Sequence, residues 1–347
     1  MNKRTEKRQN LAQLLAVLRR YGPLTQARIK EYCGLQASTV SYLVNDLKSV
    51  DLIRTVGQEL QEGKVGKPGN VICLNNEHAS FLGLYVEDDW IDTYRIGIDG
   101  TTLSAAHVDF DGQSVKEAVI SAVASELEQF PQIKGVGIAI KGIVRRDGTI
   151  KSGWRHGSGT EKSFWNFTGL QEALTQAFPH IPIIVENDAN CAAELYHYNV
   201  RREQKDLVLY LLNQIPFGIG CGLLLNGSIY RGSAGAAGEI FEKGAKFIEY
   251  ADQLKRGEAS AEQFLPAIIP HMMETAYLLD PECIVLAGSY LNDRTPEELE
   301  KLKTLWDSVP VPVVIAGGDA RLDPAKGAAL LVTDKYIEAT IEEVMQG

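Results

Sequence analysis

The sequence is poor in cysteine and has no long apolar run, and each of these features excludes a class of protein. Its five cysteines are widely scattered and form no Cys-x-x-Cys pair, which argues against a disulfide framework and against a cysteine-rich zinc site. No stretch approaches eighteen uninterrupted apolar residues, so no transmembrane helix is expected. The charged N-terminus leads into an amphipathic stretch rather than an apolar signal-peptide core. We therefore expect a cytoplasmic protein with reduced thiols that does not enter a membrane.

The net charge of −10 conceals two regions of opposite sign. Residues 1–78 contain 12 Lys and Arg against 7 Asp and Glu, a balance of +5, whereas the remainder contains 23 against 38, a balance of −15. Because DNA phosphates attract a basic surface and repel an acidic one, only the first region is suited to nucleic acid. A balance of +5 alone is often just a solvated face, so other features have to support this interpretation.

The spacing of apolar residues predicts three helices in the first fifty positions. The helix expected over 10–20 has one apolar stripe, made of Leu11, Leu14, Leu15 and Leu18. Thr25 is placed to cap a second helix over 26–32, and a short turn at 33–35 leads to a third helix over 37–50. The apolar face of that third helix contains Val40, Leu43, Val44 and Leu47.

The third helix and the segment after it have the composition of a DNA-binding surface. Its polar face carries short hydroxyl and amide side chains, which suit contacts with phosphates and base edges in the major groove. Strands expected at 52–56 and 70–74 flank a Gly- and Pro-rich loop with two lysines, the pattern of a wing. A small helical domain for protein contacts is the alternative. The expected DNA-binding residues are Arg28, Gln36, Ser38, Thr39, Ser41, Tyr42, Asn45, Lys64 and Lys67.

From about residue 79 onward the chain has the pattern of an α/β fold. Short apolar runs bounded by turn residues predict strands at 81–86, 93–98, 105–110, 135–140, 181–185, 206–213, 218–225, 280–288 and 311–316. Helices are expected over 114–129, after 186–190, before 280 and from about 325. Asn226-Gly227 is a strong signal for a two-residue hairpin.

Four motifs of this region, in order, resemble those of the ROK family, which contains bacterial sugar repressors and sugar kinases on an actin-like ATPase fold. They are Glu186-Asn187-Asp188-Ala189-Asn190-Cys191-Ala192-Ala193, Gly218-Ile219-Gly220-Cys221-Gly222, Gly235-Ala236-Ala237-Gly238-Glu239 and Asp280-Pro281-Glu282-Cys283-Ile284-Val285-Leu286. When residues 1–78 (the head) are considered together with residues 79–347 (the body), the chain resembles the sugar-repressor branch of this family.

The resemblance implies an α/β fold class, with an N-terminal winged helix-turn-helix followed by an actin-like (ROK) domain of two lobes. The expected boundaries are 1–78 for the DNA-binding domain and 79–347 for the sensor domain. Lobe one is expected to cover about 79–190 together with a C-terminal helix at about 325–347, and lobe two about 191–324.

The resemblance also implies a sugar site between the lobes. In ROK kinases, the aspartate that matches Asp188 acts as general base on a sugar hydroxyl, and the asparagine before it binds the sugar. The ligand-binding residues expected here are Gly142, Asn187, Asp188 and Glu239. Asn187 or Asp188 could instead cap the helix that follows. Gly218, Gly220 and Gly222 match the second phosphate loop of the kinases, although such a run is equally suited to a tight sheet corner.

Several departures from the family pattern argue against enzyme activity. The first phosphate loop, Asp-x-Gly-Gly-Thr in the kinases, corresponds to residues 87–91, which contain three carboxylates and no glycine and would repel a triphosphate. Phe217 stands where a threonine is usual, and Lys141 where a proline is usual. Glu242 replaces a zinc-binding histidine, and 243–260 contains no cysteine, so neither a zinc ion nor any other cofactor is expected.

We therefore expect a repressor of carbohydrate genes that binds double-stranded operator DNA as a homodimer or homotetramer. A sugar or sugar derivative between the lobes would be its effector; an anionic metabolite met by Lys141 is also possible, and Trp154, His156 and Trp165 are candidates to line the site. Two alternatives stay open. One is a sugar kinase with a regulatory head, and the other is a ligand-blind DNA-binding protein whose body only dimerises.

Overall fold

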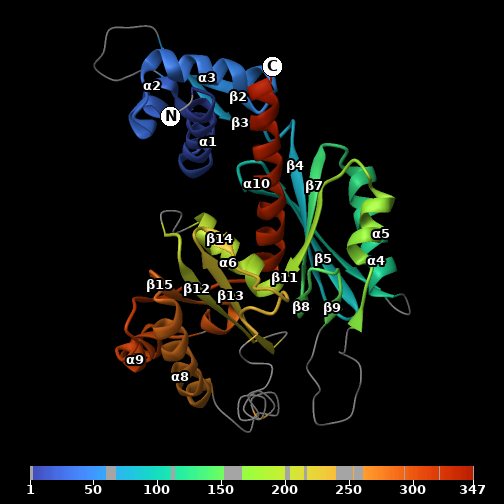
Figure 1. Ribbon diagram of the computed structural model, residues 1–347, viewed down its shortest axis with the longest axis vertical. Helices are drawn as coiled ribbons and strands as arrows, with labels where there is room; N and C mark the ends of the chain where they lie inside the picture. Colours follow the sequence, from blue (N-terminus) through green and yellow to red (C-terminus); the bar gives the residue numbers. More distant parts are fainter. Residues whose placement is uncertain are drawn as a thin grey trace.

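The head and the body are built from separate sheets and are joined through packed helices (Figure 1). The computed structural model describes residues 3–59, 68–110, 114–151, 166–199, 204–214, 217–239, 253, 261–292, 294–319 and 321–346. Within these ranges, no helix is both long enough and apolar enough to cross a membrane.

The head contains three helices and a small antiparallel sheet. The helices are α1 (Lys3–Tyr21), α2 (Gln26–Cys33) and α3 (Ala37–Ser49), and the sheet has the order β1-β3-β2, formed by Leu24–Thr25, Gly69–Leu74 and Ile53–Glu59. The Thr25 hydroxyl accepts a hydrogen bond from the Arg28 N–H, and Gly34 ends α2 with a φ of 64°. The three predicted helices and their buried stripes are confirmed, although α1 begins seven residues earlier than expected and β1 was not predicted.

The first sheet of the body has the strand order β11-β7-β4-β5-β6. Its strands are β4 (Ser80–Val86), β5 (Trp90–Gly97), β6 (Thr102–Asp109), β7 (Ile133–Ile140) and β11 (Ile183–Asn187). Helices α4 (Val115–Gln129) and α5 (Leu170–Ala177) share an apolar core with this sheet, and α4 begins with a capping box between Ser114 and Glu117. A small additional sheet is formed by β8 (Ile143–Val144), β9 (Ile150–Lys151) and β10 (Asn166–Phe167).

The second sheet has the order β14-β13-β12-β15-β16. Its strands are β12 (Leu207–Gln214), β13 (Phe217–Leu225), β14 (Ser228–Ile229), β15 (Cys283–Ala287) and β16 (Val313–Ile315). Helices α8 (Ala261–Leu279) and α9 (Pro296–Trp306) accompany it, with a short 3-10 turn at Ser289–Leu291. The predicted hairpin is confirmed, because Asn226 and Gly227 both have positive φ, 55° and 71°. Helices α5 and α9 and the short strands β8–β10 were not predicted.

Two helices, α6 (Asp188–Asn199) and α10 (Leu322–Gln346), pack against each other and against the sheets. Their contacts are so close that glycine is required. A methyl group at Gly137 of β7 would overlap the Ala328 carbonyl of α10, and one at Gly327 of α10 would overlap the Cys191 carbonyl of α6. The C-terminal half of α10 then continues to the head, as Figure 1 shows.

Candidate functional site

The exposed face of α3 consists of the polar side chains that the sequence predicts for DNA contact. Gln36, Ser38, Tyr42 and Asn45 are exposed, and Thr39 and Ser41 are half-buried. The opposite face is buried in the head, because apolar residues recur at helical spacing. Arg28 on α2 is exposed and forms an ion pair of 3.1 Å with Glu31. Lys64 and Lys67 lie outside the described residues.

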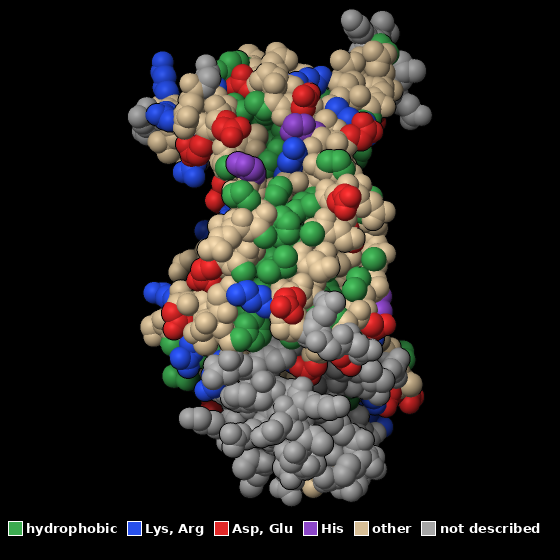
Figure 2. All heavy atoms as spheres, turned by 90° about the vertical axis from the view of Figure 1, so that its right-hand side faces the viewer, with side chains coloured by type: hydrophobic (Ala, Val, Ile, Leu, Met, Phe, Trp, Pro, Cys, Tyr) green, Lys and Arg blue, Asp and Glu red, His purple; other side chains and the backbone are tan. Residues whose placement is uncertain are grey.

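Lys7 of α1 is a member of this surface that the sequence analysis did not single out. Its Nζ donates a hydrogen bond of 2.9 Å to the Tyr42 hydroxyl and lies 2.9 Å from an Asp46 carboxylate oxygen. It also lies 4.7 Å from the centre of the Tyr42 ring. Tyr42 is thus held in one orientation by a cation on another helix, 35 residues away in sequence. Figure 2 shows Lys, Arg, Asp and Glu side chains interspersed on the face of the head that it presents.

Asn187 and Gly142, two of the predicted ligand residues, meet at the end of the first sheet. The Asn187 Nδ2 donates to the Gly142 carbonyl at 3.0 Å, and its Oδ1 accepts from the Asn190 N–H at 3.1 Å. The second bond is a helix cap, so Asn187 satisfies the alternative interpretation as well. Its role toward a ligand stays a prediction.

Asp188 begins α6 beside this contact and is partly accessible. Its Oδ1 accepts a hydrogen bond of 2.8 Å from the Ala189 N–H. Burial of the carboxyl raises the pKa of Asp188 to about 6, and the negative charge of Glu87 adds to the rise. A desolvated carboxyl that can still be reached from outside is a suitable partner for a hydroxyl group.

The segment that matches the first phosphate loop connects β4 to β5 and is held by an internal ion pair. The Lys141 Nζ lies 2.7 Å from a Glu87 oxygen and 2.8 Å from an Asp88 oxygen, and the Tyr85 hydroxyl donates to Glu87 at 2.8 Å. The two carboxylates outweigh the effect of burial and raise the pKa of Lys141. Since Lys141 is already paired with two carboxylates, it is poorly placed to meet an anionic ligand.

The predicted second phosphate loop is part of strand β13, where Gly218, Gly220 and Gly222 pair with β12. A methyl group at Gly220 would lie 2.5 Å from the Ala189 Cβ, and one at Gly222 would overlap the Ala189 carbonyl. Close packing of α6 on β13 therefore accounts for two of these three glycines, as the structural alternative proposed. A role in anion binding stays a prediction.

Glu186 is a buried carboxylate next to the predicted site that the sequence analysis did not assign. It accepts hydrogen bonds of 2.9 Å from the Asn187 N–H and from the Asn190 side chain, and it pairs with Arg231 from beyond β14. Its position directly before Asn187 was the available signal, but its partner Arg231 is 45 residues away.

The segment carrying Arg231 brings the second sheet against the first lobe and ends at Glu239, the fourth predicted ligand residue. Gly235 has a φ of 78°, and a methyl group there would overlap the Val144 carbonyl of β8. The charge of Glu239 adds to the effect of burial in raising the pKa of Cys221 on β13. This segment therefore contacts the first lobe at Glu186 and Val144, and the role of Glu239 toward a ligand stays a prediction.

The candidate lining residues Trp154, His156 and Trp165 lie outside the described residues, as does Glu242, which replaces the zinc-binding histidine of the family. The described part of the chain contains no cluster of three or more His, Cys, Asp or Glu side chains that could hold a metal ion.

Family models match two parts of the chain, residues 11–61 to the MarR family and residues 92–241 to the ROK family. Among curated relatives, the xylose repressor of Bacillus subtilis (strain 168) is 26% identical over 241 residues, which cover 67% of this chain and 60% of the relative. The DNA-binding transcriptional dual regulator NagC of Escherichia coli (strain K12) is 24% identical over 242 residues, covering 67% and 57%. The chain therefore spans about 60% of the length of the curated relatives it matches.

Solved structures of the same fold include regulators and kinases. The crystal structure of a ROK family transcriptional regulator, a homologue of the E. coli MLC protein, matches with a TM-score of 0.65 and 15% identity, over 99% of this chain and 100% of that one. A ROK family glucokinase from Streptomyces griseus matches with a TM-score of 0.51 and 17% identity, over 73% and 99%. The predicted fold class is confirmed: the head is a MarR-like winged helix-turn-helix domain, and the body, whose residues 92–241 match the ROK family model, has the fold of the solved ROK proteins.

Proposed function

We propose that this protein is a DNA-binding transcriptional repressor whose body senses a sugar. The observation that carries the proposal is the polar, exposed face of α3 in a head attached to a ROK body. Relatives named as a xylose repressor and as the regulator NagC support the same assignment. The proposed division is 1–78 for DNA binding and 79–347 for sensing.

Operator recognition falls to the face of α3, which enters the major groove in helix-turn-helix proteins. Gln36, Ser38 and Asn45 supply hydroxyl and amide groups for base edges and phosphates. A second copy of the chain would read a second half-site, so we propose a homodimer or homotetramer on double-stranded DNA.

We further propose that the body has no kinase activity. Two carboxylates, Glu87 and Asp88, stand where the kinases of the family cradle phosphates, and Lys141 neutralises them from within the protein. A triphosphate would have to displace that ion pair and approach negative charge, which is unfavourable in a site of low dielectric constant.

The effector that best suits the proposed site is an uncharged sugar. Asn187 and Asp188 offer an amide and a carboxyl for hydroxyl groups, and Gly142 and Glu239 complete the proposed site. Because Lys141 is paired with two carboxylates, sugar phosphates are expected to bind much less well than neutral sugars.

A thermal-shift screen with D-xylose, N-acetylglucosamine, their phosphates and ATP tests these assignments. A neutral sugar present at a hundred times its Kd would stabilise the body by about 2.7 kcal/mol, and the shift would disappear in Asp188→Ala. Operator duplexes selected from a random pool would then be released by the same sugar. A flat screen would favour a ligand-blind DNA-binding dimer, and consumption of ATP with a sugar would establish the kinase instead.

A further inference from the structure

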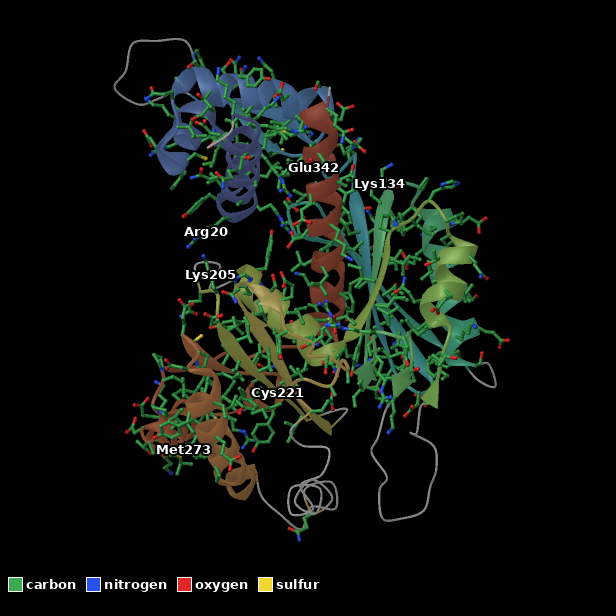
Figure 3. All side chains as sticks on the ribbon, in the orientation of Figure 1. Arg20, Lys134, Lys205, Cys221, Met273 and Glu342 are labelled. Atoms are coloured by element: carbon green, nitrogen blue, oxygen red, sulfur yellow. The ribbon has the colours of Figure 1, made fainter. Side chains whose placement is uncertain are left out.

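The head and the body share one apolar core. The stripe of α1 packs in the same cluster as residues of α10 and α6, namely Leu330, Ile337, Ile341 and Leu195. Figure 3 places Glu342 at the end of α10 that reaches the head, where it forms an ion pair of 2.9 Å with Arg8 of α1. The position of the head is therefore set by contacts with these helices.

Arg19, in the last turn of α1, contacts both helices with one guanidinium group. Its side chain is only 4% exposed. It forms an ion pair with Asp334 of α10, and its Cζ lies 4.5 Å from the centre of the Tyr198 ring of α6. Tyr198 is itself fixed, because its hydroxyl donates to the Asp99 carbonyl at 2.8 Å. The three side chains form a clamp, defined here as Arg19, Asp334 and Tyr198.

The clamp and the candidate ligand site lie at opposite ends of α6. This helix begins at Asp188 and carries Tyr198 in its last turn. A helix is a rigid element, so a displacement at its first turn is passed to its last. The close approach of Gly327 to the Cys191 carbonyl holds α6 against α10 near the start of both helices, so a tilt of α6 about this contact displaces Tyr198, at its far end, relative to α10.

We propose that the Arg19 clamp couples the candidate ligand site at the start of α6 to the orientation of the DNA-binding head. A buried cation is costly when it loses its partners, so the clamp has two arrangements, formed or released, rather than a continuum. Movement of α6 when a ligand binds beside Asp188 releases Arg19 from Tyr198, and the head then changes its angle on α10. The regulatory meaning of this device rests on the proposed function, but the mechanical coupling does not.

Hydrogen exchange of the full chain tests the coupling without DNA or sugar. In Arg19→Met, amides of α1 and of the C-terminal half of α10 should exchange at least tenfold faster, and the increase should extend along α6 to its first turn. Arg8→Met is the matched control, because Arg8 joins α1 to α10 through its ion pair with Glu342 and, among the described residues, forms no ion pair with α6. It should speed exchange in α1 and α10 only. An Arg19→Met variant whose α6 exchanges like wild type would overturn the proposal.

Asp334→Asn serves as a second variant in case Arg19→Met does not fold, because the Asp334 side chain is 42% exposed. It should give the same exchange pattern at smaller amplitude. With an operator and a sugar in hand, both variants should still bind the sugar, with at least fivefold less effect of that sugar on operator affinity. Failure of wild type to respond to any sugar would count against the proposed function, whereas an undiminished response in both variants would count against the clamp.

Discussion

The face of α3 and the loop between β4 and β5 are both polar segments, yet they use their polar groups in opposite ways. On α3, Ser38 and Asn45 are exposed and can meet another molecule. In the loop, Glu87 and Asp88 are paired with Lys141 inside the protein. The polar groups of the α3 face are thus exposed to solvent, whereas those of the loop between β4 and β5 are used within the protein.

Removal of Lys141 should produce the largest change in stability. Lys141→Met would leave Glu87, whose side chain is 9% exposed, without its cation. An uncompensated buried charge of this kind costs about 3 kcal/mol of the free energy of unfolding, measurable by urea denaturation at pH 7.5. Lys303→Met, which breaks an exposed pair with Glu300, is the matched control and should cost at most about 0.5 kcal/mol. Equal losses in the two variants would mean that the loop is not held by its ion pair.

The sequence predicted the head closely because its signals are local. The stripe from Leu11 to Leu18, the cap at Thr25 and the turn at Gly34 depend on residues within one or two helical turns. The same kind of signal located most strands of the body and the Asn226-Gly227 hairpin. The short strand β1 was not predicted, because two residues are too few to show an alternation of apolar and polar side chains.

The candidate site was less predictable because its partners are far apart in the chain. Lys141 meets Glu87 across 54 residues, and Arg231 meets Glu186 across 45. No spacing rule links such pairs, which only the topology brings together. The glycines of β13 show a second limit: their pattern suited an anion loop and a packed strand equally, and the approach of α6 accounts for two of the three.

Substitution of Asp188 should produce the next largest change in stability, and this change should depend on pH. Its folded-state pKa is raised from the ordinary 3.8 to about 6, so the folded protein binds more protons than the unfolded chain between these values. Stability therefore falls as pH rises through this window and stays reduced above it. Asp188→Asn, which cannot ionise, should be more stable than wild type at pH 7.5 by up to about 3 kcal/mol, and the two should converge near pH 4.

The control for this experiment is Asp147→Asn, whose expected effect on stability at pH 7.5 has the opposite sign. Asp147 accepts a hydrogen bond of 3.0 Å from the Thr149 N–H, which lowers the pKa of its carboxyl. Its ionised form is favoured by folding, so Asp147→Asn should be less stable than wild type at pH 7.5 and should approach it at acidic pH. A pH-independent difference between Asp188→Asn and wild type would show that the Asp188 carboxyl is not desolvated.

The smallest expected effect is on the head and appears in DNA binding rather than in stability. Asn45 is exposed on α3, so Asn45→Ala removes an amide from the recognition face without opening a cavity. The free energy of unfolding should stay within about 0.5 kcal/mol of wild type, while operator affinity falls by about 1.5 kcal/mol, roughly tenfold, if the amide reads a base edge. Fluorescence anisotropy with a selected operator and with an unrelated duplex separates the two kinds of contact. A loss confined to the operator assigns base recognition to Asn45, and an equal loss on both duplexes assigns it to a phosphate. Unchanged affinity for both duplexes would mean that Asn45 does not contact DNA. The exposed polar face of α3 would then be no better a guide to function than the buried polar groups of the loop between β4 and β5.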